Sequence, residues 1–422
     1  MFKTLFTILF VLVAATTLFG CAATVNSAPE KIARPATAET VSLNVIAQET
    51  DMFPLPTPQH LPTTEPYLPS TATAEKIRAT TATAIATNTI TATNTLTPTP
   101  TALPVLPLRD DLEPMELQDF PRPPNDNGLG IHFTADGYYD EPELDRQIAR
   151  MKELNLKWAT VIYTDENHLE LAARKFSEAG IFVLWRKSLK PHQRYFSWQR
   201  DIDIIKKYNL PPYMQLYNEA ELQVEWDGQE PDRDVFIRNL LTAAKDVYNA
   251  GGYPGIQILD EDWLREFINQ VYARKGDALF KRMFFIPHAY GLNHPPDYQE
   301  DINGALGFRV YATIFFKRLG FVPPFIIGEG GWKIESVEDN RFPKIDDQLH
   351  RDYTLAVYDW FRTGKLSHGG NLPDYLFAFN MWMISGPQEA GAWYDSSFGN
   401  RTLTIEAVKK IPPFVRKFSW DN

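Results

Sequence analysis

Two glutamates are placed so that their carboxyl groups could act together, one as a general acid and base and the other as a nucleophile. Glu219 follows Asn218 at the end of the apolar run 213–217, and Glu329 ends the run 325–328 and precedes two glycines. A helix start would also explain an Asn-Glu pair, because Asn caps helices and acids favour the positive helix N-terminus. Glu329 lacks such an explanation, since a charge at the end of a buried run is costly. The sequence therefore predicts Glu219 and Glu329 as a catalytic pair.

Further polar and aromatic residues share this placement just after an apolar run. They are His132, Tyr163, Arg186, Asp260, His288, Tyr290, Trp332 and Trp382. Acids, ring donors and indole faces are the groups that build sugar sites without cofactors, so these residues predict carbohydrate contacts. Each could instead be a wall or core residue, and Asp260 could simply begin a helix.

Two other assignments remain open for the polar residues. His132 and His288 could ligate a metal with Asp260, but no paired-histidine spacing supports this, so neither a metal nor another cofactor is expected. Glu221 lies two residues beyond Glu219 and could compete for the acid role. The Asn-Glu pairing at a strand end favours Glu219.

Eight short apolar runs, which alternate with stretches of helical length, must position these residues. Strands are predicted at 129–133, 158–163, 181–185, 213–217, 255–259, 283–287, 325–328 and 376–380, and helices include 141–154, 167–179, 232–250 and 344–361. Eight repeats favour a closed (β/α)₈ barrel of the α/β class over an open sheet. Strands four and seven face each other across the mouth of such a barrel, so the two glutamates could approach a ligand from opposite sides.

The same residues resemble those of a known superfamily, the retaining (β/α)₈ glycosidases of clan A. Gln215-Leu216-Tyr217-Asn218-Glu219 is similar to its fourth strand, and His288-Ala289-Tyr290 is similar to the His-x-Tyr of its cellulase-like 5/39 type. The segment 326–332 resembles the nucleophile strand, and Trp382 matches a tryptophan on strand eight. The resemblance spans residues 128–412. The superfamily often places an arginine near the end of strand two, whereas this chain has Arg186 after strand three.

The resemblance implies a role for each matching residue. Glu219 would be the acid/base, Glu329 the nucleophile, and Asn218 the group that holds the sugar 2-hydroxyl. Tyr290 would orient Glu329, and Trp382 would form the sugar platform. His132, Arg186, His288 and Trp332 complete the expected substrate contacts.

The N-terminal quarter of the sequence predicts an export signal followed by a tether. Residues 1–20 carry a short basic start and an apolar run, which indicates an export signal, and Leu18-Phe19-Gly20-Cys21 resembles a bacterial lipobox. The apolar run is shorter than the roughly 20 residues that span a bilayer, which disfavours an uncleaved membrane helix. Acylation of Cys21 is therefore expected. Residues 21–108 are rich in Thr, Ala and Pro and predict a disordered tether, which leaves 109–422 as the catalytic domain.

Composition narrows the class of function. A net charge of −11 with only short basic clusters disfavours a nucleic-acid partner. The expected protein is a monomeric, lipid-anchored, extracytoplasmic retaining glycoside hydrolase on the cell surface, acting on a β-linked poly- or oligosaccharide. The alternatives are a non-catalytic carbohydrate-binding lipoprotein on the same barrel and a transglycosylase with the same carboxylates. The sugar and the linkage depend on loops, notably 187–199 and 387–400.

Overall fold

The computed structural model describes residues 113–135 and 137–421. The predicted signal segment 1–20, the lipidated Cys21 and the tether 21–108 lie outside the described residues. Within the described part of the chain, no helix combines the length and the apolar character that crossing a membrane requires.

Eight parallel strands form a closed barrel, which confirms the predicted (β/α)₈ architecture. The strands are β1 (Leu129–His132), β2 (Trp158–Tyr163), β3 (Phe182–Lys187), β4 (Tyr213–Gln215), β5 (Tyr253–Ile256), β6 (Phe284–Phe285), β8 (Phe325–Ile327) and β10 (Leu376–Met381). Their order around the barrel is β1-β10-β8-β6-β5-β4-β3-β2. All eight predicted strands are present.

Two short strands extend the barrel toward its mouth. β7 (His288–Tyr290) and β9 (Glu329–Gly331) pair in parallel, with His288 opposite Glu329. Each continues a barrel strand after a short break, at Pro287 after β6 and at Gly328 after β8. The extension therefore places His288 and Glu329 side by side beyond the barrel.

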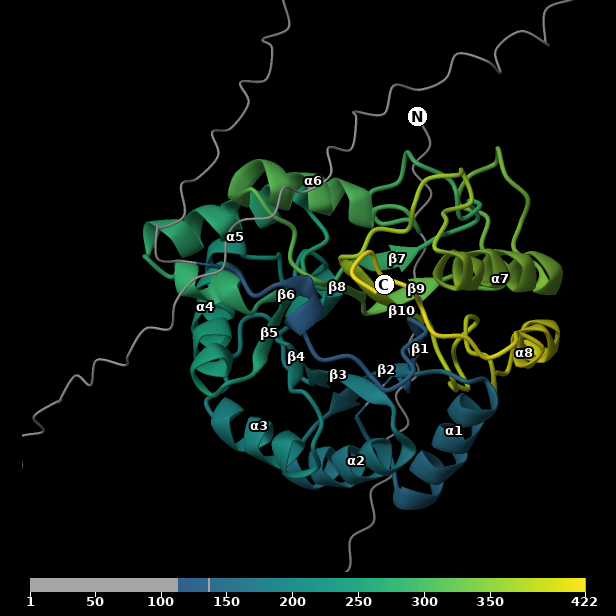
Figure 1. The fold of residues 1–422 in the computed structure, drawn as a ribbon, viewed down its shortest axis with the longest axis horizontal. Coiled ribbons are helices and arrows are strands. Elements are labelled where there is room, and N and C mark those ends of the chain that lie inside the picture. Colours follow the sequence, from purple (N-terminus) through teal and green to yellow (C-terminus); the bar gives the residue numbers. More distant parts are fainter. Residues whose placement is uncertain (1–112, 136, 422) are drawn as a thin grey trace, which may run out of the picture. The chain divides into compact units, whose positions relative to one another are not determined.

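Helices surround the strands, as Figure 1 shows. They are α1 (Glu141–Glu153), α2 (Glu166–Ala179), α3 (Trp198–Lys207), α4 (Arg233–Asn249), α5 (Glu261–Ala273), α6 (Phe308–Leu319), α7 (Asp347–Thr363) and α8 (Thr402–Lys409), with short 3₁₀ turns η1 (Leu117–Asp119), η2 (Gln223–Trp226) and η3 (Asp277–Lys281). Five α-helices begin at an aspartate whose side chain accepts from backbone N–H groups of the first turn: Asp140, Asp165, Asp232, Asp260 and Asp346. Such caps each contribute about 1 kcal/mol. The prediction that Asp260 begins a helix is confirmed.

The two ends of the described chain close the barrel at the amino ends of its strands. The N–H of Met115 donates to the carbonyl of Lys281, just before β6, at 2.8 Å. From the other terminus, Arg416 donates through its backbone to the carbonyl of Asp126 at 2.8 Å and through its guanidinium to the carbonyl of Pro373 at 2.9 Å. The guanidinium also lies 4.1 Å from the centre of the Phe418 ring. The opposite end, where the strands terminate, stays open.

Candidate active site

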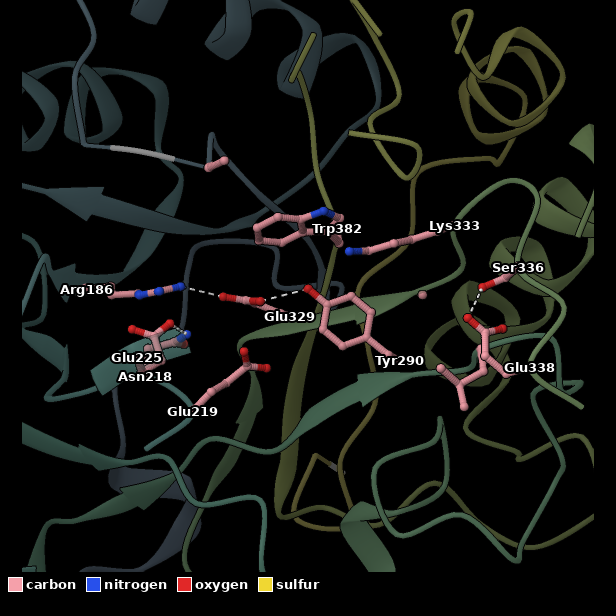
Figure 2. A pocket seen from close by; sticks show the side chains of 13 residues that line it. Arg186, Asn218, Glu219, Glu225, Tyr290, Glu329, Lys333, Ser336, Glu338 and Trp382 are labelled. Atoms are coloured by element: carbon pink, nitrogen blue, oxygen red, sulfur yellow. Dashed lines mark hydrogen bonds and ion pairs between the residues drawn. The ribbon is translucent and has the colours of Figure 1, made fainter. Parts of the chain in front are cut away.

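A cavity of about 440 Å³ lies at the carboxyl ends of the strands. Its walls include six of the residues that the sequence singled out, Arg186, Asn218, Glu219, Tyr290, Glu329 and Trp382, together with Ala135, Glu225, Leu292, Gly331, Lys333, Ser336 and Glu338. Figure 2 shows Glu329 between Arg186 and Tyr290, with Trp382 beside it. Acidic, basic and aromatic side chains thus converge on one volume of the size that small-molecule sites commonly have.

Glu329 is buried, with 3% of its surface exposed, yet both of its carboxyl oxygens have partners. Arg186 donates to Oε1 at 2.5 Å and the Tyr290 hydroxyl donates to Oε2 at 2.8 Å. Burial alone would raise the pKa of this carboxyl, but the charges of His288 and Arg186 and the Tyr290 hydrogen bond outweigh it and hold the pKa well below its usual range. Glu329 is therefore an anion at neutral pH, which is the state that a nucleophile needs.

Glu219 sits on an unusual backbone. Its φ of 37° lies in the left-handed region, which costs a residue with a side chain on the order of 1–3 kcal/mol. Its N–H donates to Oε1 of the buried Gln257, just past β5, at 2.6 Å, and this bond holds the turn in place. The carboxyl group is partly open to solvent, with 19% of the side chain exposed.

The two carboxyl groups approach each other closely. Three side-chain atoms lie within 4.8 Å of one another: a carboxyl oxygen of Glu219, a carboxyl oxygen of Glu329 and a ring nitrogen of His288. Retaining glycosidases hold their two carboxyls about 5–5.5 Å apart, whereas inverting ones need roughly 6.5–9.5 Å. The two oxygens measured here lie closer together than the start of the inverting range.

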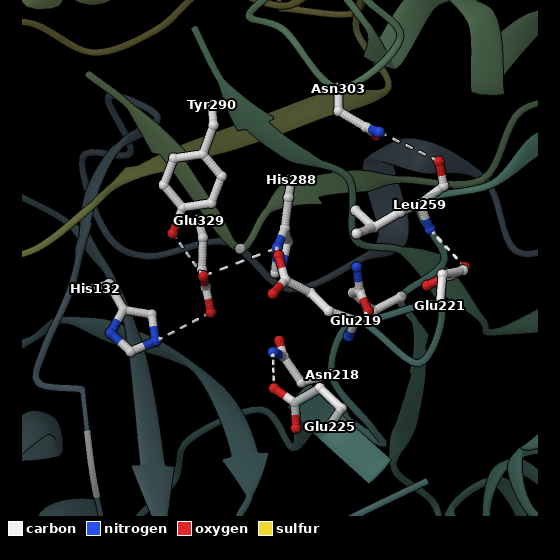
Figure 3. A network of polar contacts seen from close by, with 12 residues as sticks. His132, Asn218, Glu219, Glu221, Glu225, Leu259, His288, Tyr290, Asn303 and Glu329 are labelled. Carbon is white, nitrogen blue, oxygen red and sulfur yellow. Dashed lines mark hydrogen bonds and ion pairs between the residues drawn. The ribbon is translucent and has the colours of Figure 1, made fainter. Parts of the chain in front are cut away.

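Two buried histidines lie next to the carboxylate pair without lining the cavity, His132 beside Glu329 and His288 between the two glutamates (Figure 3). His288 Nδ1 is 2.8 Å from Glu219 Oε1 and 3.8 Å from Glu329 Oε2. Burial would lower the pKa of His288, but the charge of Glu329 and the bond to Glu219 raise it above its ordinary value. His132 Nε2 is 3.6 Å from Glu329 Oε1, and burial lowers the pKa of this histidine to about 3, so its ring is neutral.

Other candidates from the sequence lie apart from the cavity. Trp332 is only 2% exposed, and its indole donates to the carbonyl of His294 at 2.8 Å, so it packs away from the cavity wall. The Tyr163 hydroxyl donates to Asp201 at 2.6 Å outside the barrel, and Asp260 caps α5. Glu221 accepts from the N–H of Leu259 at 2.8 Å rather than lining the cavity.

Several wall residues carried no signal in the sequence. Glu225 accepts a hydrogen bond from Asn218 Nδ2 at 3.0 Å. Lys333 Nζ lies 5.3 Å from the ring centre of Tyr290 and 5.6 Å from that of Trp382. The Trp382 indole is held by Glu389, which accepts from Nε1 at 3.0 Å. Glu225 and Lys333 lie in loops beyond the ends of β4 and β9, so the paths of these loops bring them to the cavity.

The cluster of Glu219, His288 and Glu329 also has the composition of a metal site. However, the Arg186 guanidinium and the Tyr290 hydroxyl already bind both oxygens of Glu329. A second cation would meet the positive charge of Arg186 at close range, which is unfavourable in a buried site. The residues present therefore fit a carboxylate pair better than an ion.

No protein-family profile matches the chain, and a comparison with curated proteins finds no match either. Solved structures resemble it only weakly. A β-1,3-glucanase of Cryptomeria japonica pollen is 13% identical with a TM-score of 0.41 over 70% of this chain and 100% of the other. An endo-β-1,4-mannanase from Thermotoga petrophila is 12% identical with a TM-score of 0.39, over 68% and 77% of the two chains.

A Parabacteroides merdae β-glucuronidase is 12% identical with a TM-score of 0.38 over 61% of this chain, which spans only 31% of that structure. Proteins with other chemistry match to a similar degree, among them a 3-deoxy-D-arabino-heptulosonate 7-phosphate synthase from Thermotoga maritima with a TM-score of 0.35. Likenesses this distant do not discriminate between activities.

Proposed function

We propose that the chain is a retaining glycoside hydrolase that cleaves a β-linked poly- or oligosaccharide. The observation that carries the proposal is the pair Glu219 and Glu329, whose oxygens lie within 4.8 Å in a cavity lined by polar and aromatic side chains. Their surroundings differ as the two roles require. Glu329 is buried and held as an anion, and Glu219 is partly open beside it.

In this mechanism Glu329 attacks the anomeric carbon while Glu219 gives its proton to the leaving glycosidic oxygen. The C–O bond to the leaving group breaks as the bond to Glu329 forms, which yields a glycosyl-enzyme. Glu219, now a carboxylate, takes a proton from water, and that water displaces Glu329 from the sugar. Two inversions restore the starting configuration.

Neighbouring side chains support these steps. Arg186 and Tyr290 orient the Glu329 carboxylate and stabilise its charge before attack and after release. His288 Nδ1 lies 2.8 Å from Glu219 Oε1 and so fixes the orientation of the Glu219 carboxyl group. Trp382 offers an indole at the cavity wall on which a sugar ring can stack.

The test compares three alanine variants on a series of 4-nitrophenyl β-glycosides. Glu329→Ala and Glu219→Ala should each lower kcat by at least about a thousandfold, because each removes a reacting group. Glu221→Ala is the matched control, since this neighbouring carboxyl does not line the cavity. Wild-type turnover that survives both substitutions would refute the proposal.

Azide then separates the two roles. A small anion can replace the missing carboxylate, and it enters from the face that the substitution opens. Glu329→Ala should yield an α-glycosyl azide, and Glu219→Ala should yield a β-glycosyl azide from the trapped intermediate. The reverse assignment of products would exchange the two roles.

A non-catalytic carbohydrate binder is the main alternative, because strand two lacks an arginine. In the structure Arg186 from β3 binds Glu329 at 2.5 Å and so supplies a cation to that carboxylate. Transglycosylation would use the same pair, and product analysis at high acceptor concentration distinguishes it from hydrolysis.

We also propose that Cys21 is acylated and anchors the barrel outside the cell through the segment 21–108. The lipobox-like segment Leu18-Phe19-Gly20-Cys21 supports this proposal. Two or more acyl chains suffice for a stable membrane anchor. Mass spectrometry of membrane fractions should find a lipid-modified Cys21 at the mature N-terminus, and an unmodified cysteine there would refute it.

A further inference from the structure

Glu225 is a third carboxylate in the cavity wall, and its position is set by the loop after β4. It lies in η2, seven residues beyond Asn218, and its Oε1 accepts from Asn218 Nδ2 at 3.0 Å. Figure 3 shows Glu225 beside Asn218, apart from the Glu329 carboxylate. The double displacement by Glu219 and Glu329 does not involve Glu225.

The loop holds Glu225 firmly. The buried Trp226 donates its indole N–H to the carbonyl of Ala220 at 2.7 Å, which fixes the turn. Lys190 from the loop after β3 lies 3.5 Å from Glu225 Oε2 and donates to the carbonyl of Val224 at 3.3 Å. Only 17% of the Glu225 side chain is exposed. The carboxylate is thus fixed from two sides rather than free in solvent.

A chain of hydrogen bonds determines which way the Asn218 amide faces. Gln215 Nε2 points to the carbonyl of Tyr217 at 3.3 Å, and a carbonyl can only accept, so this atom is the nitrogen. The same nitrogen donates to Asn218 Oδ1 at 3.1 Å. Asn218 Nδ2 therefore faces Glu225, and the carboxylate accepts one of its two hydrogens. The other hydrogen remains for a ligand.

We propose that Glu225 is a positioning residue that acts through Asn218. The inference rests on the proposed glycosidase function. The charge-assisted bond locks the carboxamide so that its second N–H points at the sugar hydroxyl next to the anomeric carbon. Without Glu225 the amide could rotate, and its contact with that hydroxyl would weaken in the transition state.

The test measures kcat/KM on the 4-nitrophenyl β-glycoside that the wild type cleaves fastest and on its 2-deoxy counterpart. Glu225→Ala should lower kcat/KM on the first substrate by about ten- to a hundredfold and on the 2-deoxy substrate by less than about threefold. Glu225→Gln keeps an acceptor oxygen for Asn218 and should recover much of the loss. A purely structural role would affect both substrates alike.

The matched control is Asp227→Asn in the same loop. Asp227 lies 3.8 Å from the same Lys190, is exposed, and has a left-handed φ of 54° that Asn tolerates. It does not line the cavity, so this variant should keep wild-type kcat/KM. Melting temperatures of all variants show whether the loop remains folded.

A double-mutant cycle decides whether Glu225 acts through Asn218. In an Asn218→Ala background, Glu225→Ala should change kcat/KM by less than about twofold, because the group it positions is gone. Losses that multiply, or an unchanged kcat/KM in Glu225→Ala alone, would overturn the inference. If the inference failed in this way but the wild type were active and Glu329→Ala abolished that activity, the proposed function would still hold. A wild type that cleaves no glycoside would overturn both.

Discussion

At the mouth of the barrel, the two glutamates Glu219 and Glu329 lie in different surroundings. Glu329 is surrounded by a guanidinium, a phenol and two imidazoles, all within hydrogen-bonding or ion-pairing range. Glu219 has one close side-chain partner, His288 Nδ1 at 2.8 Å. Glu329 is therefore held as an anion, whereas Glu219 has a partly exposed carboxyl group at the cavity wall.

Glu221 provides a prediction about stability and pH. Burial raises the pKa of its carboxyl from 4.5 to about 7, against the bonds from Leu259 and Asp260 that lower it. Between these pH values the folded state binds more protons than the unfolded one, so the free energy of unfolding falls as pH rises. The full difference corresponds to roughly 3 kcal/mol.

The substitution Glu221→Gln removes this titration. We expect the wild type to lose stability relative to the variant between pH 4.5 and 7.5, and the difference to be constant outside that window. Urea denaturation of both proteins at several pH values measures it. Parallel stability curves across the whole range would contradict the prediction.

The sequence identified the carboxylates but not all their neighbours. Glu329 was predictable because an isolated charge after an apolar run has few structural explanations. Strand alternation also indicates that Trp332 faces away, since Glu329 and Gly331 line the cavity and side chains alternate along a strand. Glu225 and Lys333 were not predictable, because their positions depend on how the loops after β4 and β9 turn.

At the level of secondary-structure elements, the breaks in two strands shape the site. The predicted strand 283–287 ends early, and the chain resumes pairing as β7 only after Pro287, which has no N–H for a ladder bond. The second break falls at Gly328, where a β-carbon would lie 2.7 Å from a methyl of Ile286. Periodicity located both strands, but the offset of β7 and β9 depends on these local contacts.

Two loops are tied together at the far wall of the cavity. Asn293, in the loop after β7, accepts from the N–H of Asp339 at 2.9 Å and donates to its carbonyl at 2.8 Å. His294 Nε2 lies 3.1 Å from the Asp339 carboxylate. These two loops contribute Leu292 and Glu338 to the wall, so their mutual position sets the shape of the cavity there.

The substitution Asn293→Ala should separate these loops. Because Asn293 is buried and the backbone of Asp339 would lose both partners, we expect the free energy of unfolding to fall by about 1–3 kcal/mol. KM should rise while kcat changes little, since the carboxylates are untouched. Thermal denaturation and steady-state kinetics measure both effects, with the exposed Asn371→Ala as control. A fall in kcat at constant KM would show that the loops act on the chemical step.

On the scale of the whole molecule, contacts that stabilise the fold at the closed end of the barrel lie far from the cavity at its open end. The buried Arg416 donates to the carbonyls of Leu376, Phe377 and Pro373 at the closed end, at the opposite end of the strands from the cavity. Arg416→Ala removes the buried donor of these three hydrogen bonds, so the free energy of unfolding should fall by about 2–4 kcal/mol. The value of kcat/KM at 25 °C should stay within twofold of the wild type.

The neighbouring Lys417→Ala is the control for this prediction, because Lys417 is exposed and lies on the same segment. It should leave the melting temperature unchanged. If Arg416→Ala reduced turnover without a change in melting temperature, the two ends of the barrel would be coupled.

The architecture as a whole was predictable because eight apolar runs with intervening helices leave few alternatives to a closed barrel. The closure of its lower end was not. The segments 113–127 and 411–421 have no strong periodicity, and they are ordered by contacts between residues far apart in the chain, such as Arg416 with Asp126.

The described chain both enters and leaves the barrel at its closed end, so either terminus is a natural point of attachment. A barrel attached to a solid support through residue 113 or residue 421 would present the open end of the described barrel, which holds the cavity, away from the support. In this orientation the cavity would face a ligand that is fixed on an opposing surface.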